Sequence, residues 1–179
     1  NKVVVVVDIL RATSVICTMF KSGVKEMIPV RDIEEAKAYK AKGFLVVAER
    51  SGEKLDFADF GNSPFYFTPE TVGGKTVVYS TTNGTNAITV GKDAGMVAIG
   101  SFLNFNAVLK FLLSKQSDIL ILCAGWKGKF CLEDTLFAGA LASELIKSGS
   151  YSTVCDSVYA AMDLWDVAKK DVPGYLEKV

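Results

Sequence analysis

The sequence contains no histidine, and its lysines and arginines equal its aspartates and glutamates at 20 each. The lack of histidine excludes Ser-His-Asp hydrolases, histidine phosphatases and zinc sites with imidazole ligands. A bound metal must therefore be held mainly by oxygen atoms, which favours Mg²⁺, Ca²⁺ or Mn²⁺. Because the net charge is zero, no basic excess is available for nucleic acid or for an anionic membrane, and we expect neither as a partner.

Disulfide signals and long apolar runs are lacking as well. The four cysteines form no CxxC pair, and a chain of 179 residues buries enough surface to fold without disulfides. No run approaches the roughly 20 apolar residues of a membrane span, and we recognise no signal peptide. We therefore expect reduced thiols and a cytoplasmic protein. The chain opens at Asn1 directly before an expected strand and without a Met, so we also expect residues to be missing at one or both ends.

Strand patterns and helical patterns alternate along the chain, which predicts an α/β fold with a mainly parallel sheet and helices on both faces. Residues 49–74 are rich in Gly and Pro and are expected to form one long functional loop. We expect residues 1–179 to form a single domain, either as one unit or as two lobes with the site in a cleft. The expected strands are 3–7, 26–30, 44–48, 75–80, 96–100 and 119–123, and the expected helices are 12–22, 33–42, 85–92, 104–114, 133–148 and 152–169.

Polar residues gather where four of these strands end. Ligands of open α/β sheets bind outside the carboxyl ends of the strands, so these segments predict one convergent site. The segments contain Asp8, Arg11, Thr13 and Ser14; Glu49 and Arg50; Ser80 to Thr85; and Cys123, Gly125, Lys127, Gly128, Glu133 and Asp134.

Asp8 follows the first strand, with Arg11 three residues later. The carboxylate could hold Mg²⁺ or attack phosphorus, and the guanidinium could form a bidentate pair with a phosphoryl or acid group. An Asp–Arg ion pair beside a helix cap explains the same residues equally well. The nucleophile motif of haloacid-dehalogenase phosphatases requires a second Asp where Leu10 stands, which argues against that family.

Residues 80–85, with the sequence STTNGT, place hydroxyls, an amide and backbone N–H groups at the start of an expected helix. Such helix starts bind phosphate or sulfonate. A polar turn with a helix cap is the alternative. No Lys occurs at the spacing of a Walker loop.

Glu133 and Asp134 begin another expected helix, where acidic residues are also ordinary partners of the helix dipole. Adjacent carboxylates on a helix point in different directions, so at most one of them faces the cleft. Glu49 could supply a further oxygen ligand. Cys123 is favoured as a wall residue, because no histidine is present to activate a thiol and no CX₅R phosphate loop follows it.

Six motifs occur in the order in which they appear in the 2-phosphosulfolactate phosphatases, and the sequence resembles that family from residue 3 to about 145. The motifs are DILRATS at 8–14, AERSG at 48–52, GNSP at 61–64, STTNGT at 80–85, GSFLN at 100–104 and CAGWKGKFCLEDTLFAGA at 123–140. The resemblance implies a family-specific α/β fold and Mg²⁺-dependent hydrolysis of 2-phosphosulfolactate to sulfolactate and phosphate, a step of coenzyme M biosynthesis. The motifs implicate Asp8, Arg11, Glu49, Asn62, Ser63, Thr82, Asn83, Gly84, Glu133 and Asp134.

From these motifs and the strand ends, we predict three overlapping sets of site residues. The catalytic set is Asp8, Arg11, Glu133 and Asp134, and the metal set is Asp8, Glu49, Glu133 and Asp134. The substrate-binding set is Arg11, Thr13, Ser14, Arg50, Asn62, Ser63, Thr81, Thr82, Asn83, Gly84, Thr85, Gly125, Lys127 and Gly128.

The sequence leaves rival functions and the oligomeric state open. Asn86 stands where many family members carry Arg, so another small phospho-acid remains an alternative substrate. A non-catalytic binder of a small anionic metabolite is the second alternative, because a fold does not fix a function. A homo-oligomer is compatible with the sequence.

Overall fold

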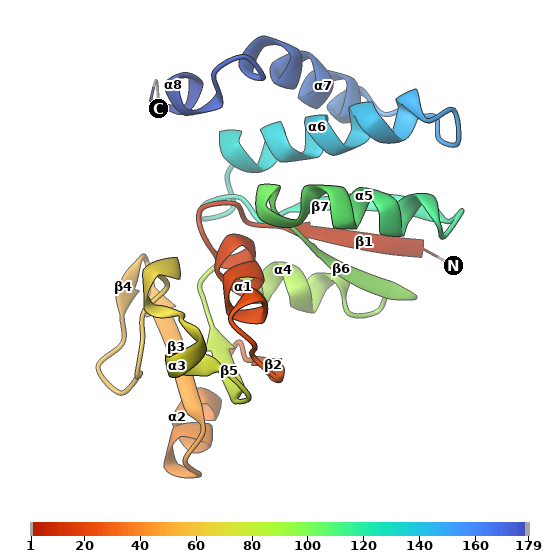
Figure 1. Cartoon of the computed structure of the whole chain (residues 1–179). Coiled ribbons are helices and arrows are strands. Elements are labelled where there is room, and N and C mark those ends of the chain that lie inside the picture. The colour runs from red at the N-terminus through yellow and green to blue at the C-terminus, as the bar shows by residue number, and fades with distance from the viewer. Residues whose placement is uncertain (1, 178–179) are drawn as a thin grey trace.

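The computed structural model describes residues 2–177, and its strands form two sheets, which Figure 1 shows in an upper and a lower lobe. All strand pairs are parallel except β3 with β4, which confirms the expected α/β class with mainly parallel strands. In the upper sheet the strands lie in the order β6 (Met96–Gly100), β1 (Lys2–Val7) and β7 (Asp118–Cys123). In the lower sheet the order is β2 (Glu26–Pro29), β5 (Thr76–Ser80), β3 (Leu45–Arg50) and β4 (Glu53–Lys54).

β1 is the central strand of the upper sheet because its run of valines is apolar on both faces. Val3, Val5 and Val7 pack against α5 and α6, whereas Val4 and Val6 pack against α4. Helices therefore cover both faces of this sheet, and α7 lies along the outer side of α6 (Figure 1). The helices of this lobe are α4 (Gly84–Gly91), α5 (Phe105–Leu113), α6 (Leu132–Lys147), α7 (Asp156–Ala168) and α8 (Val172–Leu176).

The lower sheet is also covered on both faces, by α1 (Ala12–Lys21) and α3 (Pro69–Val72) on one and α2 (Ile33–Ala41) on the other. The buried face of α1 packs against β3 and β5. Ile88 of α4 and Ile99 of β6 pack against the same cluster. The helix α1 therefore lies between the lobes and joins their cores (Figure 1).

Two expectations about local structure were wrong. Residues 49–74 are not one long loop, because they form β4, a 3₁₀ helix at Pro64–Tyr66 and α3. Pro64 and Pro69 each begin one of these helices, where the missing N–H of proline costs no hydrogen bond. The helix expected at 152–169 begins at Asp156, and the short helix α8 was not expected.

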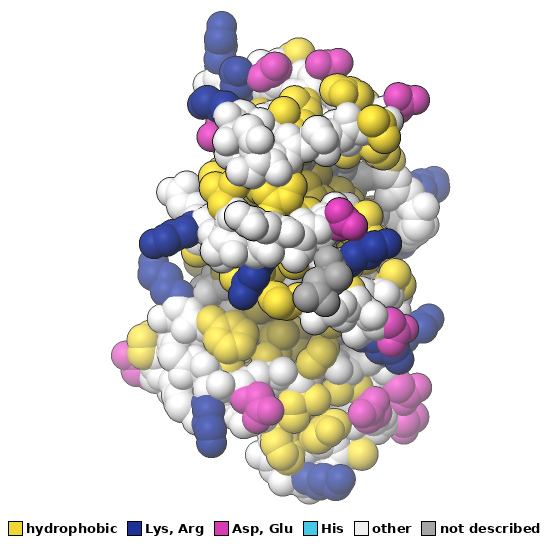
Figure 2. Space-filling view, turned by 90° about the vertical axis from the view of Figure 1, so that its right-hand side faces the viewer, with side chains coloured by type: hydrophobic (Ala, Val, Ile, Leu, Met, Phe, Trp, Pro, Cys, Tyr) yellow, Lys and Arg dark blue, Asp and Glu magenta, His cyan; other side chains and the backbone are white. Residues whose placement is uncertain are grey.

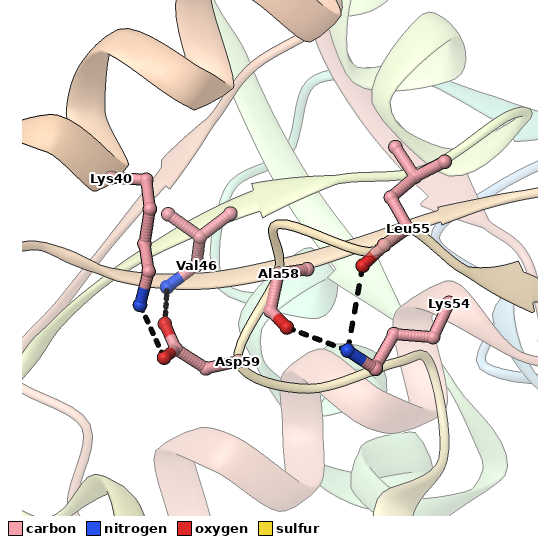
Figure 3. A network of polar contacts seen from close by, with 6 residues as sticks. All are labelled: Lys40, Val46, Lys54, Leu55, Ala58 and Asp59. Atoms are coloured by element: carbon pink, nitrogen blue, oxygen red, sulfur yellow. Dashed lines mark hydrogen bonds and ion pairs between the residues drawn. The ribbon is translucent and has the colours of Figure 1, made fainter.

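Segment 54–59 is ordered because it is fastened to β3, as Figure 3 shows. Asp59 pairs with Lys40 of α2 and accepts a hydrogen bond from the Val46 N–H at 2.8 Å. Lys54 donates to the carbonyl oxygen of Ala58 at 2.8 Å. These bonds hold the turn after β4 against β3 and α2, although residues 55–59 form neither helix nor strand.

On the face shown in Figure 2, basic and acidic side chains are interspersed. This distribution agrees with the zero net charge of the sequence. Within residues 2–177, no helix combines the length and the apolar character that crossing a bilayer requires.

Phe137→Ala is expected to reduce the free energy of unfolding by about 3–5 kcal/mol. Phe137 is fully buried and contacts Phe102 and Phe105, so its loss opens a cavity beneath the upper sheet. The measurement is urea unfolding followed by circular dichroism. Val90→Ala on α4 is the control, because Val90 is 72% exposed and its loss should change the free energy by less than about 0.5 kcal/mol. Equal effects of the two variants would contradict this description of the core.

Candidate functional site

The turn after β1 is built around Asp8, which is buried. Its Oδ1 accepts a hydrogen bond from the Ala12 N–H at 3.1 Å, at the start of α1. The Thr13 hydroxyl donates to the Asp8 carbonyl oxygen at 2.8 Å and accepts from the Asp8 N–H at 3.1 Å. Thr13, predicted to bind substrate, therefore holds this turn with both of its hydrogen-bonding functions.

Arg11 is exposed beside Asp8, yet the two side chains form no ion pair in the part of the chain that the structure describes. The residue preceding α1 is Arg11 itself, and it makes no side-chain cap. The alternative explanation of these residues, an Asp8–Arg11 ion pair beside a hydroxyl helix cap, is therefore not what forms at this turn. The guanidinium of Arg11 also donates no hydrogen bond within residues 2–177 and is free to receive an anion.

The end of β5 meets the end of β1 at Gly84, the first residue of α4. A Cβ atom on Gly84 would lie 2.4 Å from the Ala12 Cβ and 3.1 Å from Asp8 Oδ2. Only glycine permits this approach, which brings strand ends from the two sheets together. Thr81 and Thr85 hydrogen-bond each other, with the Thr85 N–H donating to the Thr81 hydroxyl at 3.2 Å. Asn83 makes no side-chain cap, so its half-buried amide remains available.

The end of β3 is joined to the same region through Glu49, which is 4% exposed. Its two oxygens accept hydrogen bonds from the Thr82 N–H and the Gly52 N–H, both at 2.7 Å. Arg50 was predicted to bind substrate. Its guanidinium instead donates to the carbonyl oxygens of Glu49 and Arg31 and to the Ser80 hydroxyl, and so holds the ends of β3 and β5 together.

The end of β7 is joined to the end of β1 through Asp134, which is 2% exposed. Its Oδ1 accepts from the Ile9 N–H at 2.8 Å, and its Oδ2 accepts from the Gly125 N–H at 3.1 Å. Glu133 is half-buried and accepts a hydrogen bond from the Cys131 thiol at 3.0 Å. The two adjacent carboxylates therefore have different partners, as expected.

The loop after β7 places Lys127 and Gly128 at the surface, both with positive φ. The ammonium of Lys127 lies 5.4 Å from the centroid of the Trp126 ring, so this cation rests on an aromatic face rather than on a carboxylate. Gly125 is held by Asp134 and also has a positive φ, and a Cβ there would meet the Lys129 carbonyl oxygen at 2.3 Å. A glycine is required at Gly125 by both its φ and this contact.

The carboxylates at these strand ends raise one another's pKa values, in addition to the effect of burial. Burial raises the pKa of Asp8 to about 6, and the nearby charges of Glu49 and Glu133 add to the rise. Burial likewise raises the pKa of Asp134 to about 7, with contributions from Asp8 and Glu133. Concentrated negative charge of this kind favours a cation.

The donor chemistry fits Mg²⁺. No ready-made cage of three or more Cys, Asp or Glu side chains exists within residues 2–177. Asp134 and Glu49 already accept backbone N–H bonds on both oxygens, which leaves Asp8 and Glu133 as the carboxylates best able to face a cation. One or two carboxylates are what Mg²⁺ commonly takes from a protein, because waters and substrate phosphate complete its coordination.

Sequence reasoning missed Tyr79. It is fully buried, and its hydroxyl donates a hydrogen bond to Asn62 Oδ1. Burial raises the pKa of Tyr79, and the charges of Asp8 and Glu49 raise it further. The sequence feature that could have indicated a site role for Tyr79 is its hydroxyl, which stands in an apolar strand directly before residues 80–85. Ser63, next to Asn62, is half-buried and makes no side-chain cap.

Ser101 was also missed, although it lies in the GSFLN motif. Its buried hydroxyl hydrogen-bonds the Ser14 hydroxyl at 2.9 Å, and the Ser14 hydroxyl donates to the Ile9 carbonyl oxygen at 2.8 Å. Ser14, predicted to bind substrate, thus joins the turn after β1 to the end of β6. Burial, together with the charge of Asp134, raises the pKa of Cys123 to about 12, which agrees with a wall residue rather than a nucleophile.

Comparison with known proteins gives a single family. A family profile described as 2-phosphosulpholactate phosphatase matches residues 1–179. The chain is similar to a "Probable 2-phosphosulfolactate phosphatase" of Caldanaerobacter subterraneus subsp. tengcongensis, with 44% identity over 149 residues, or 81% of this chain and 62% of the relative. A protein of Thermotoga maritima with the same name is 46% identical over 141 residues, or 79% of this chain and 61% of the relative.

A third relative of that name, from Prochlorococcus marinus, is 38% identical over 179 residues, or 96% of this chain and 74% of the relative. The chain spans about three fifths of the length of the first two relatives, at 62% and 61%. Since the profile covers every residue from 1 to 179, the chain belongs to the 2-phosphosulfolactate phosphatase family.

Proposed function

We propose that this protein hydrolyses the phosphate monoester of 2-phosphosulfolactate to sulfolactate and phosphate, with Mg²⁺ as its cofactor. The step would serve coenzyme M biosynthesis, and the substrate is a small anionic phospho-acid. One observation carries the proposal: in a chain of this family, Asp8, Gly84 and Asp134 bring three strand ends from two sheets to one point, with several carboxylates there.

Anion binding rests on Arg11 and on the start of α4. Arg11 is exposed and has no ion-pair partner within the described part of the chain. The start of α4 adds the positive end of a helix dipole and the side-chain amide of Asn83. A planar guanidinium binds two phosphoryl oxygens at once, so Arg11 orients the phosphate against the helix start.

Asp8 is the residue placed for the chemistry. It lies between the start of α1 and Gly84. Burial raises the pKa of Asp8 to about 6, so its carboxyl group is still mainly ionised at neutral pH. Its carboxylate either attacks phosphorus or aligns the attacking water. A Mg²⁺ ion at Asp8 and Glu133 would neutralise the charge that develops on the phosphoryl oxygens.

Another phospho-acid remains the second candidate substrate. Asn86 donates to the Thr82 carbonyl oxygen at 2.8 Å, and its buried Oδ1 has no partner among the described residues. Because Asn86 is neutral, it adds no positive charge next to residues 80–85 for a sulfonate or carboxylate, which keeps a less anionic phospho-acid as an alternative. A non-catalytic binder would need Arg11 and the start of α4, but it would gain nothing from buried carboxylates.

The direct test is phosphate release from 2-phosphosulfolactate and from a small panel of phospho-acids, with and without Mg²⁺. We expect metal-dependent turnover with the highest kcat/KM for 2-phosphosulfolactate. Preference for another phospho-acid would keep the chemistry and replace the substrate. If no substrate is turned over by a chain as long as the relatives, the protein is a binder.

Asp8→Asn is expected to lower kcat on the order of 10³-fold or more at saturating Mg²⁺. Asparagine keeps the shape of the side chain and an acceptor for the Ala12 N–H, but it removes the charge. Asp118→Asn at the exposed start of β7 is the matched control and should keep full activity. Full activity of the Asp8 variant would show that another group acts on phosphorus.

The stability of the metal-free protein should fall as the pH rises from about 5 to 8. The pKa values of Asp8 and Asp134, about 6 and about 7, lie above their ordinary value, so the folded protein retains protons that the unfolded chain releases. This stabilisation is complete below about pH 4 and is lost as the pH passes through the two raised values. Mg²⁺ would offset the negative charge that Asp8 and Asp134 gain on losing their protons, so its effect on Tm should be larger at pH 8 than at pH 5.

Thermal melts with and without Mg²⁺ at the two pH values provide the measurement. Asp134→Asn should flatten the pH dependence of Tm, whereas Asp163→Asn on the exposed side of α7 should leave it unchanged. An equal Mg²⁺ effect at both pH values would place the cation away from these carboxylates.

A further inference from the structure

The strand β7 lies at an edge of the upper sheet and pairs only with β1 within residues 2–177. The N–H of Ala124, directly after β7, donates to the Val7 carbonyl oxygen at 2.8 Å. Backbone groups of a strand point to alternate sides, so Leu120 and Leu122 also face β1. The N–H and C=O groups of Ile119, Ile121 and Cys123 then point away from the sheet, where no described strand meets them.

The composition of β7 is that of an inner strand. Its sequence, DILILC, has one charge, at Asp118, and that residue is the first of the strand. Edge strands are commonly protected by charges, prolines or bulges, because open backbone groups pair with other chains. Leu120 is nonetheless 55% exposed, although it lies in a run as apolar as that of the central strand β1.

A recessed apolar groove runs along this open edge. Its volume is about 690 Å³, and β7 forms one side of it. The opposite walls come from α6, through Ala142 and Ile146, and from residues 151–158. Phe130 and Val154 line the groove and are 71% and 98% exposed, which is unusual for side chains of this size and type.

We propose that β7 is an inner strand of a larger sheet, and that its missing neighbour is a β-strand from the part of the family's polypeptide that lies outside the matched residues. The open backbone groups would supply main-chain hydrogen bonds, and the groove would receive alternate apolar side chains. This proposal does not depend on the catalytic activity.

The length of the relatives identifies the occupant. The match to the Prochlorococcus marinus relative takes in 96% of this chain but only 74% of that relative, so that protein carries further sequence that has to pack somewhere. A second copy of this chain fits less well, because α6 and residues 151–158 wall the groove along this edge. One extended strand enters such a groove, whereas the β7 of a second copy would bring its own groove walls with it.

Hydrogen exchange tests the proposal on two chains. One is residues 1–179, and the other carries, fused to its ends, the segments of the Prochlorococcus marinus relative that lie outside the match, which takes in 96% of this chain. We expect the amides of Ile119, Ile121 and Cys123 to exchange about 100-fold more slowly in the fused chain. The amides of β1 should be protected in both chains, which verifies that each is folded.

A pair of variants distinguishes strand pairing from a general gain in stability. In the fused chain, Leu120→Lys should lower Tm by more than about 3 °C, the size expected for a change of roughly 1 kcal/mol. Leu103→Lys is the matched control, because Leu103 is 67% exposed and lies outside the groove. Its Tm should change by less than about 1 °C.

Two results would overturn the proposal. Fast exchange at Ile119, Ile121 and Cys123 in a folded fused chain would show that no strand pairs there. Slow exchange in residues 1–179 alone, together with sedimentation as a dimer, would make a second copy the occupant. If the fused chain does not fold, the same exchange measurement on the intact Prochlorococcus marinus relative decides the question at the strand aligned with β7.

Discussion

The arrangement of the site depends on the carboxylate of Asp134, which accepts one backbone N–H from the end of β1 and another from the end of β7. Because Asp134 is almost fully buried, each of these N–H groups would otherwise lack a partner, at a cost of about 1–3 kcal/mol. Glu49 does the same for the ends of β3 and β5. Charged groups are thus used as acceptors that hold strand ends in place.

This use of buried carboxylates divides them by role. Asp134 and Glu49 are occupied by backbone groups, whereas Asp8 and Glu133 are the pair that we propose for a cation. Burial is the main cause of the raised pKa values of Asp8 and Asp134, and the charges of neighbouring carboxylates raise both further. Gly84 completes the arrangement by letting the start of α4 approach Asp8, so the helix start and the carboxylates share one point in space.

The proximity of the strand-end residues was predictable from the sequence, whereas the hydrogen-bond partners of each residue were not. Asp8, Glu49, residues 80–85 and Asp134 follow strands, and the strand-end rule for parallel sheets brought them together correctly. Thr13 and Arg50 were expected to bind substrate, but their partners are backbone and hydroxyl groups. Hydrogen bonds between residues far apart in the chain leave no periodic signal, so a polar side chain at a strand end does not reveal its partner.

Three features of the structure escaped prediction for related reasons. Hydrophobic periodicity shows that strands exist, but not which strand pairs with which, so the division into two sheets followed only from the observed pairing. Tyr79 was overlooked because its strand reads as apolar, although its hydroxyl reaches Asn62 among the site residues. Residues 49–74 read as irregular from their glycines and prolines, and bonds such as that from Val46 to Asp59 order them.

The central claim is that Asp8 and Glu133 face the cation while Asp134 and Glu49 hold the backbone. The most direct measurement is anomalous scattering from crystals soaked in Mn²⁺, which replaces Mg²⁺ at oxygen sites. The account predicts a peak at about 2.0–2.3 Å from a carboxylate oxygen of Asp8 and within the coordination sphere of Glu133, with the Asp134 bonds to Ile9 and Gly125 intact. A peak bound by Asp134 or Glu49 with those backbone bonds broken, or a peak remote from Asp8, would contradict it.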